Sequence, residues 1–532
     1  GDSRLAALVR KRQDLVTEWR SLDQARLGAV SKPMAQRHPA AEAEIRNRLA
    51  AIDRELGDID RRLAKDFPKY SALARPEPAT VAEVRRHLKE NEALVLVLPT
   101  PALAPTTGET FIWVVTKARG RWVRSPLQPR ELKDLVDALR CGLDYIGSWQ
   151  GERRFDLLKT VYTETDYQSV NPLPFRLTLA HTLYKALFGG IEDLIQGKDL
   201  LIVPSGSLTQ LPFQVLVTKP PITDEPTRES FAQASWLIRH HALTVLPSVA
   251  ALPALRGHAR KSQASKPFIG FGNPLLEGNP RIDWHPAAAE EARAIRGCAR
   301  RAPLRTAALR GAPVRPLART ADRVDVAHVR AQSPLPETAE ELCAVARQAR
   351  AAPGDVFLGA TASESAIKDL SVSGQLATYR VVHFATHGAL AGELKGSNEP
   401  GLILTPPAQA TPGDDGYLSA SDVAGLKLNA DWVILSACNT AAGGSDTAEA
   451  LSGLAKAFFY AGARALLVSH WAVDSLSTVA LITGAFEELE RAPANGRAHA
   501  LRKSMLALID SNTHTWHPAY WAPFVVVGDG AL

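Results

Sequence analysis

The pattern of apolar positions over residues 4–67 predicts two long helices. Apolar side chains recur at alternating steps of four and three, the a/d spacing of packed helices, at Ile45, Leu49, Ile52, Leu56, Ile59 and Leu63. A second stripe that could face them consists of Leu8, Leu15, Trp19 and Leu22. Ser31-Lys32-Pro33 between the two stripes is a turn signal. We therefore expect an antiparallel α-helical hairpin over residues 1–67, followed by a proline-rich linker over residues 68–79.

From residue 80 onward, short apolar runs alternate with amphipathic segments, which is typical of an α/β architecture. Strands are predicted at 93–98, 110–116, 122–125, 200–203, 243–246, 267–272, 380–386, 401–404, 432–437 and 464–470. Helices are predicted near 130–146, 176–195, 287–299, 336–350, 448–461, 475–490 and 496–509. The almost unbroken apolar character of 433–435 and 465–468 favours strands buried on both faces, hence a mostly parallel sheet flanked by helices. A substrate crevice is expected at the carboxyl ends of its strands.

Composition and cysteine usage narrow the class of protein. The 532 residues are 45% hydrophobic and 22% charged, and no apolar run is long enough to cross a bilayer, so neither a disordered nor a membrane protein fits. The four cysteines are scattered without a C-x-x-C pair, which predicts neither a disulfide framework nor a zinc site. The reducing cytoplasm is then the expected location. Because the chain begins at Gly1 without Met, we expect it to start inside a longer protein, with room for a targeting segment upstream.

The net charge of +6 is unevenly distributed along the chain. Residues 300–320 hold six arginines, three prolines and no acidic side chain. One interpretation is a solvated surface loop, and the other is a basic contact surface for nucleic acid or an acidic partner. The segment has no aromatic side chain on which a base could stack, which favours the loop.

Two strand ends carry residues with catalytic chemistry, His387 and Cys438. If their strands are parallel neighbours, both side chains emerge at the same edge of the sheet. The separation is close to the roughly 50 residues by which the caspase histidine precedes the caspase cysteine. An imidazole within hydrogen-bond reach lowers the pKa of a thiol and accepts its proton. Gly388 has no Cβ in the way, so its N–H and that of Cys438 could stabilise an oxyanion.

The pattern by itself leaves structural interpretations open. A cysteine that ends an apolar strand is often a small buried hydrophobe, and a strand histidine is often a core residue. His383 lies on the same face as His387, but no third ligand is suitably spaced for a metal, so we interpret it as a packed residue. Asn439 adjoins the cysteine and is expected to point away from it. No serine-hydrolase elbow or phosphate loop is present, and no cofactor or metal is expected.

Several ordered motifs resemble the CHAT family of caspase-like, separase-related cysteine peptidases. They cover approximately residues 130–530 and comprise Leu201-Ile202-Val203-Pro204-Ser205-Gly206-Ser207-Leu208, Leu211-Pro212-Phe213, His383-Phe384-Ala385-Thr386-His387-Gly388, Leu435-Ser436-Ala437-Cys438-Asn439-Thr440, Leu451-Ser452-Gly453-Leu454-Ala455-Lys456-Ala457-Phe458, Ala461-Gly462-Ala463-Arg464, Ser469-His470-Trp471-Ala472-Val473-Asp474 and Tyr520-Trp521-Ala522-Pro523-Phe524.

The resemblance implies a caspase-like α/β fold and a cysteine endopeptidase with the catalytic dyad His387 and Cys438. Residues 256–532 would form the catalytic domain, and residues 80–255 an N-terminal α/β part that supports it or is itself a degenerate protease-like module. The partners implied are a protein or peptide substrate and an upstream helical-repeat sensor, in a bacterial signalling or defence pathway. The alternative is a catalytically silent scaffold that mediates protein–protein interaction.

Two residues near the end of the predicted strand 464–470 need separate interpretation, Asp474 and His470. Asp474 lies where the fold builds the wall of its specificity pocket and could select a basic P1 side chain. It could equally cap the helix that begins near Ser475. His470 stands where family members commonly carry an apolar residue, and we expect it to face solvent or the rim of the crevice.

Overall fold

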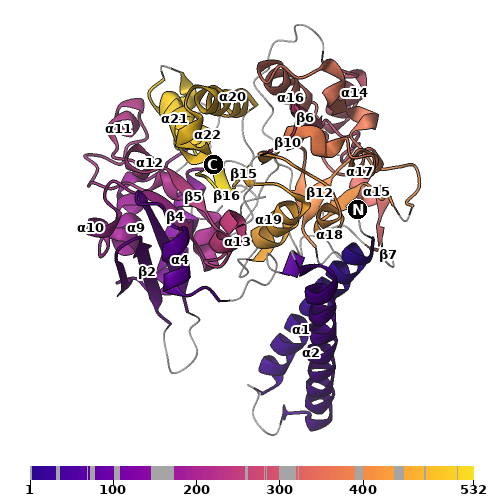
Figure 1. Ribbon diagram of the computed structural model, residues 1–532, viewed down its shortest axis with the longest axis horizontal. Coiled ribbons are helices and arrows are strands. Elements are labelled where there is room, and N and C mark those ends of the chain that lie inside the picture. Colours follow the sequence, from indigo (N-terminus) through magenta and orange to yellow (C-terminus); the bar gives the residue numbers. More distant parts are fainter. Residues whose placement is uncertain are drawn as a thin grey trace.

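The computed structural model describes residues 3–30, 36–68, 70–71, 78–100, 108–144, 173–257, 262–280, 282, 284–298, 319–320, 323–389, 399–411, 413–436, 449–471, 475–511 and 513–531. Within them one large mixed sheet crosses the molecule (Figure 1). Its eleven strands are β1 (Glu92–Pro99), β2 (Thr110–Thr116), β3 (Gly120–Arg124), β4 (Asp199–Val203), β5 (Leu243–Val245), β6 (Lys266–Gly272), β9 (Val356–Leu358), β10 (Tyr379–Ala385), β14 (Trp432–Leu435), β15 (Ala465–Ser469) and β16 (Phe524–Gly528).

The strand order across this sheet is β3-β2-β1-β4-β5-β16-β15-β14-β10-β6-β9. Pairing is parallel except for β3 with β2, β2 with β1, and β16 with β15. The mostly parallel sheet predicted from the apolar strands is therefore confirmed. The carboxyl-terminal strand β16 lies between β5 and β15, so strands from residues 80–255 and from residues 256–532 join in one continuous sheet.

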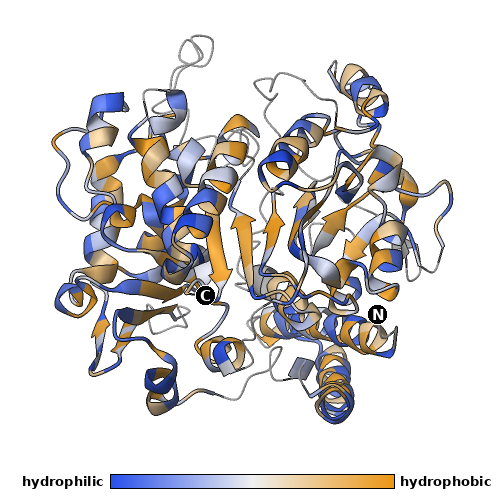
Figure 2. Ribbon diagram, turned by 45° about the horizontal axis from the view of Figure 1, so that its top comes forward, coloured by the Kyte–Doolittle hydropathy of each residue, from blue (hydrophilic) through white to orange (hydrophobic). Residues whose placement is uncertain are grey.

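Helices cover both faces of the sheet, and alternate strand residues point to opposite sides. In β14, Trp432 and Ile434 belong to one apolar cluster, whereas Val433 and Leu435 belong to another. The first cluster includes residues of α5 (Pro129–Cys141), α9 (Leu177–Phe188), α16 (Glu337–Gln348), α20 (Ser475–Arg491) and α21 (Arg497–Ile509). The other face is covered by α1 (Ser3–Val30), α2 (Pro39–Asp66), α18 (Ala420–Ala424) and α19 (Glu449–Ala461), and farther along the sheet by α4 (Val81–His87) and α13 (Ala251–Gly257). Figure 2 shows the apolar central strands between helices of mixed hydropathy.

The N-terminal helical hairpin predicted from the apolar stripes is confirmed. Helices α1 and α2 run side by side and extend from the body of the molecule (Figure 1). Arg48 bonds Glu18 across the pair at 2.6 Å, and Arg12 bonds Asp60 at 2.8 Å. The buried seam of α2 consists of Leu49, Ile52, Ile59 and Leu63. Within the expected linker, Tyr70 is buried with its ring 5.0 Å from that of Tyr460 in α19, so the chain is already packed there.

Some predicted elements differ from those observed. The single helix expected over 176–195 is wrong, because the chain turns at Gly189 and Gly190 between α9 and α10 (Glu192–Ile195). The strand expected at 401–404 exists as β12 (Gly401–Ile403), but it belongs to a separate three-stranded sheet with β11 (Gly388–Ala389) and β13 (Tyr417–Ser419). The apolar pattern predicts neither β9 nor β16. The remaining described elements include α14 (His285–Ala294), α15 (Val326–Arg330), α17 (Glu364–Val372), α22 (Pro518–Trp521), α11 (Arg228–Gln233), α12 (Leu237–His240), β7 (Arg319–Thr320) and β8 (Arg323–Val324).

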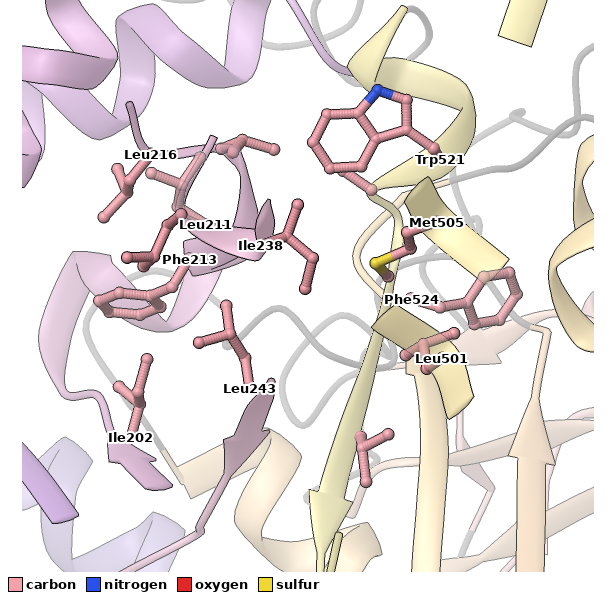
Figure 3. Packing of buried hydrophobic residues seen from close by; sticks show 14 of the residues in the cluster. Ile202, Leu211, Phe213, Leu216, Ile238, Leu243, Leu501, Met505, Trp521 and Phe524 are labelled. Atoms are coloured by element: carbon pink, nitrogen blue, oxygen red, sulfur yellow. The ribbon is translucent and has the colours of Figure 1, made fainter. Parts of the chain in front are cut away.

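The two parts of the sheet meet in one buried apolar cluster (Figure 3). Side chains from residues 202–243 contact those of the carboxyl-terminal segment, and the Trp236 and Trp521 rings lie 5.2 Å apart. The buried Gln214 donates hydrogen bonds from Nε2 to the carbonyl oxygens of Ala522 (3.0 Å) and Phe524 (2.9 Å). The segment that precedes β16 is thereby fixed to the first part of the sheet.

Candidate active site

Strands β10 and β14 are parallel neighbours, as the sequence predicts for the two strands that precede the candidate dyad. Their register pairs Val381 with Trp432 and Phe384 with Leu435. The Ser436 N–H donates to the Phe384 carbonyl at 2.9 Å, so the pairing continues one residue past β14. The two strands therefore end together at one edge of the sheet.

His387 lies just beyond the carboxyl end of β10 and is 2% exposed. Its Nε2 lies 2.8 Å from the carbonyl oxygen of Ser333, in the loop before α16. A carbonyl only accepts, so Nε2 carries a proton in this contact. The lone pair of the neutral imidazole is then on Nδ1, which fixes the nitrogen that can act as a base.

Gly388 begins the short strand β11 beside His387. The Ile403 N–H of β12 donates to the His387 carbonyl at 2.9 Å, and Gly388 faces Leu402 in this antiparallel ladder. This pattern makes Gly388 and Leu402 a non-hydrogen-bonded pair. The Gly388 N–H is therefore directed away from β12, on the side of the strand that the ladder does not use.

Cys438, Asn439 and Asp474 lie outside the described residues, as do positions 300–318 of the arginine-rich segment. The catalytic cysteine, the amide that would complete the oxyanion hole, the selection of P1 by Asp474 and the basic contact surface therefore remain predictions. His387 and Gly388 are the candidate site residues that the structure describes.

His383 is a core residue, as predicted. It is fully buried in β10, its ring is perpendicular to that of Phe268 at 5.9 Å, and its Nε2 lies 3.2 Å from Oε1 of the equally buried Glu341 in α16. The described residues contain no group of three or more His, Cys, Asp or Glu side chains that could hold a metal ion. The contacts of His383 thus link the central sheet to α16.

The prediction that His470 faces solvent or the crevice rim is wrong. His470 is 3% exposed, and burial lowers its pKa well below the ordinary value, with a further contribution from the nearby Arg140 cation. The fully buried Arg140 donates to the His470 carbonyl at 3.1 Å and to Asp144 at 2.6 Å, and its guanidinium lies 5.2 Å from the ring centre of Trp471. No local pattern indicates this burial, because Arg140 is 330 positions away from His470.

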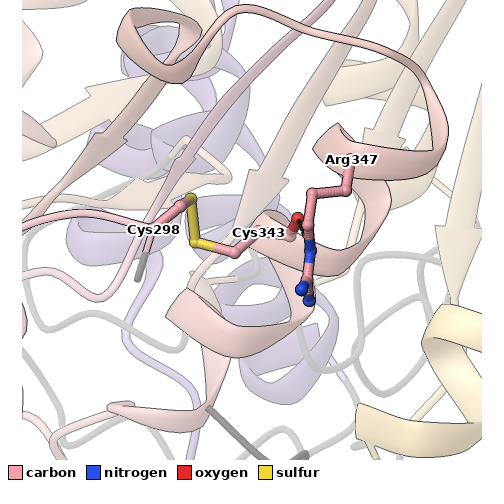
Figure 4. The surroundings of a disulfide bond; sticks show 3 residues. All are labelled: Cys298, Cys343 and Arg347. Carbon is pink, nitrogen blue, oxygen red and sulfur yellow. Dashed lines mark hydrogen bonds between the residues drawn. A yellow bond between two sulfur atoms is a disulfide. The ribbon is translucent and has the colours of Figure 1, made fainter. Parts of the chain in front are cut away.

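The cysteine pattern predicts no disulfide framework, but the structure contains a disulfide bond. Cys298 and Cys343 are bonded, which ties the chain that follows α14 to the middle of α16 (Figure 4). In the next turn of α16, Arg347 Nε donates to the Cys343 carbonyl at 3.2 Å. Cysteines 45 positions apart give no local signal, since only the fold brings α14 and α16 together.

Comparison with known proteins identifies the family. The CHAT domain profile matches residues 177–529, and the chain belongs to the CHAT family. Its sheet of parallel strands flanked by helices is of the caspase-like α/β class that this family implies. No described helix has both the length and the apolar character required to cross a membrane.

Individual relatives resemble this chain over limited stretches. Mouse tetratricopeptide repeat protein 28 is 31% identical over 112 residues, which is 21% of this chain and 4% of that protein. Among solved structures, a separase from Saccharomyces cerevisiae in complex with securin matches with TM-score 0.39 and 12% identity, over 97% of this chain and 37% of that one. The Arg-specific cysteine proteinase gingipain R matches with TM-score 0.32 and 9% identity, over 76% and 75% of the chains. The chain thus spans well under half the length of the mouse repeat protein and of the separase.

Proposed function

We propose that this chain is a cysteine endopeptidase with Cys438 as nucleophile and His387 as base. The observation that carries the proposal is the parallel pairing of β10 with β14, in which Phe384 is the register partner of Leu435. His387 follows Phe384 by as many residues as Cys438 follows Leu435. Membership of the CHAT family supports it, since that family includes peptidases with this dyad. The separase and gingipain names are consistent with the class of reaction but carry none of the argument.

In the proposed mechanism, Nδ1 of His387 takes the proton of the Cys438 thiol and the thiolate attacks the scissile carbonyl carbon. The negative charge then develops on the substrate oxygen, which accepts hydrogen bonds from the Gly388 and Cys438 N–H groups. The imidazolium returns its proton to the leaving amine, which leaves a thioester on Cys438. His387 next takes a proton from water, whose oxygen attacks the thioester carbon. The carbon–sulfur bond then breaks, the acid product leaves, and the Cys438 sulfur takes the proton back from His387. The Ser333 carbonyl accepts from Nε2–H throughout and stabilises the imidazolium.

The test is cleavage of a peptide library by the parent chain and by Cys438→Ala. Cys141→Ala is the matched control, because Cys141 is a buried cysteine at the end of α5. We expect Cys438→Ala to abolish turnover and Cys141→Ala to retain it. Alkylation should also abolish turnover, whereas a chelator should not. A folded parent chain that cleaves nothing while binding a protein partner would instead support the silent scaffold.

The substrate class that we propose is a peptide with a basic P1 residue, selected by Asp474. A carboxylate in a partly desolvated pocket binds Arg or Lys through a charge-assisted contact, and a neutral side chain would leave it unpaired. We expect the parent to prefer Arg over Leu at P1 by at least about tenfold, equivalent to 1.4 kcal/mol, and Asp474→Asn to lose that preference. An unchanged Arg-to-Leu ratio in Asp474→Asn would show that this residue only caps the helix beginning at Ser475.

We further propose that the hairpin α1–α2 connects the peptidase to an upstream helical-repeat module that carries the activating signal. The similarity to a tetratricopeptide repeat protein is consistent with such a module. A bacterial signalling or defence pathway belongs to the same proposal. The Cys298–Cys343 disulfide does not favour the cytoplasmic location expected from the sequence, because structural disulfides are rare in the cytoplasm. Adding the separately expressed upstream region to the chain should change its peptidase rate, and an unchanged rate would contradict this role.

A further inference from the structure

Ser333 contacts two buried histidines with two different groups. Its carbonyl accepts from His387 Nε2 at 2.8 Å, and its hydroxyl lies 3.3 Å from Nε2 of His285, the first residue of α14. The exposed fractions of His285, Ser333 and His387 are 2%, 5% and 2%. A hydrogen bond between groups this buried is strong, because no water can replace either partner.

The other side of the His285 ring determines its tautomer. The Asn279 N–H donates to His285 Nδ1 at 2.7 Å, so Nδ1 is an acceptor and the proton of the neutral ring is on Nε2. Nε2–H therefore donates to the Ser333 hydroxyl. Gly278, at φ +73°, makes room for the ring, since a Cβ there would lie 2.5 Å from His285 Nδ1. The loop is thus built around this imidazole.

The chain on either side of Ser333 is fixed by its own bonds. Before it, the Glu277 N–H donates to the Arg330 carbonyl at 2.7 Å, which joins this segment to the loop that surrounds His285. After it, Thr338 Oγ1 donates to the Leu335 carbonyl at 2.8 Å and accepts from the Asn273 N–H at 2.7 Å. Between these two fixed points, the hydrogen bond from His285 holds Ser333 directly.

We propose that His285 is a positioning residue that acts through Ser333 on His387. By donating to the Ser333 hydroxyl it holds the Ser333 carbonyl in place, and that carbonyl keeps the His387 proton on Nε2 and the basic lone pair on Nδ1. This inference rests on the proposed function for its effect on catalysis, whereas its effect on the His387 tautomer is independent of peptidase activity. Hydrogen bonds of this kind behind a working histidine orient the ring and select its tautomer.

The experiment compares three substitutions in the intact chain. Asn reaches only the position of Nδ1, so His285→Asn can keep the Asn279 contact but loses the donor to Ser333. Gln reaches the position of Nε2, so His285→Gln can restore that donor. Ser333→Ala removes the hydroxyl and leaves the carbonyl. His328→Asn is the matched control, because the His328 side chain lies in the same segment, is 43% exposed and contacts Asp325.

The first readout is the ¹⁵N spectrum of the histidine imidazoles, with the His387 signals assigned by their loss in His387→Gln. The parent should show His387 protonated on Nε2, and His285→Asn and Ser333→Ala should each shift part of the population to the other tautomer. His285→Gln should restore the parent spectrum, and His328→Asn should match it. Unchanged His387 signals in both His285→Asn and Ser333→Ala would overturn the proposal, even if the parent cleaves no peptide.

The second readout is the steady-state kinetics on the best peptide from the library. We expect kcat to fall about tenfold or more with KM little changed in His285→Asn and in Ser333→Ala. The double variant should be no slower than the slower single variant, because both remove the same hydrogen bond. Multiplying effects in the double variant would show that the two residues act separately and would overturn the proposal. If His285→Asn does not fold, Ser333→Ala alone decides both readouts.

Discussion

At the scale of single residues, hydrogen-bond partners distinguish the buried histidines. His517 accepts from the Ala519 N–H at Nδ1 and contacts the Leu173 carbonyl through Nε2, at 3.1 and 3.0 Å. Burial lowers its pKa to about 4, so it is neutral and structural at pH 7. His387 differs in its position, because it stands at the carboxyl end of β10, beside the end of β14. This position distinguishes His387 from His383, which lies within β10, and from His517, which caps α22 (Pro518–Trp521).

The depressed pKa of His517 predicts a loss of stability in mild acid. The unfolded residue takes up a proton near pH 6.5, but the folded one does so only near pH 4, so its contribution is present above pH 6.5 and is lost as the pH falls towards 4. Between these values the loss is about 1.4 kcal/mol per pH unit for one proton. His517→Gln should flatten the dependence of the free energy of unfolding on pH by about that amount, measured by denaturant titration at pH 5 and 7. An unchanged slope would show that His517 is not kept neutral by burial.

At the scale of elements, the hairpin contacts α18 and α19, the helices that precede and follow Cys438 along the chain. In α1, Arg10 lies 3.7 Å from Glu399 and 3.6 Å from Asp422 in α18. Burial raises the pKa of Glu399, while the Ser421 N–H and Arg10 lower it. Burial and the Arg12 cation of the hairpin lower the pKa of Lys456 in α19. These contacts give the hairpin a physical connection to the helix that follows the candidate nucleophile.

Removing Arg10 should weaken that connection. Arg10→Ala leaves the buried Glu399 carboxylate without its cation, and because Arg10 is itself 32% exposed we expect a loss of about 1 kcal/mol. Arg26→Ala, whose side chain pairs with Asp23 within α1 and is 46% exposed, is the matched control and should have no measurable effect. Thermal unfolding and the peptidase rate of both variants check this. A peptidase rate unaffected by Arg10→Ala, despite the lost stability, would count against communication through this contact.

The disulfide is a second connection between elements. Cys298–Cys343 closes a loop over a sequence separation of 45, and closure of such a loop is worth about 2–4 kcal/mol. We expect Cys343→Ser, or addition of reductant, to lower the free energy of unfolding by that amount. Thiol titration of the protein isolated from cells under alkylating conditions tests the bond itself. Free thiols at both positions would contradict the disulfide and favour the reducing cytoplasm, because structural disulfides are rare there.

At the scale of the whole molecule, the central position of β16 makes the two parts of the sheet interdependent. β16 pairs with β15 over five residues and with β5 at Val527. Gln214 donates hydrogen bonds to the carbonyls of Ala522, just before β16, and of Phe524, its first residue. Gln214→Met approximately keeps the volume but removes the donor to two buried carbonyls, which should cost about 1–3 kcal/mol. We expect one cooperative thermal transition that moves to lower temperature in this variant. Two separate transitions would show that residues 80–255 fold as an independent unit.

Local patterns predicted most elements, but not how distant segments meet. The apolar runs located β1, β10, β14 and β15 within about two residues, because strands buried on both faces have a strong signal of their own. β16 is equally apolar and as long as β15, but its central place depends on pairing with β5 and β15, which are distant in the sequence. The strand ends located His387, whereas Ser333, His285 and the Cys298–Cys343 pair carry no motif. Their roles arise from contacts between segments that the sequence pattern does not relate.

The most direct test of the dyad is the rate at which Cys438 reacts with iodoacetamide at pH 6.5, measured by mass spectrometry of its peptide. A thiolate paired with the His387 imidazolium should react much faster than an ordinary thiol of pKa about 8.5, which is almost fully protonated at that pH. His387→Gln should slow the reaction at least about tenfold, whereas the exposed control His328→Asn should leave it unchanged. A Cys438 rate equal to that of an ordinary thiol and unaffected by His387→Gln would contradict the account.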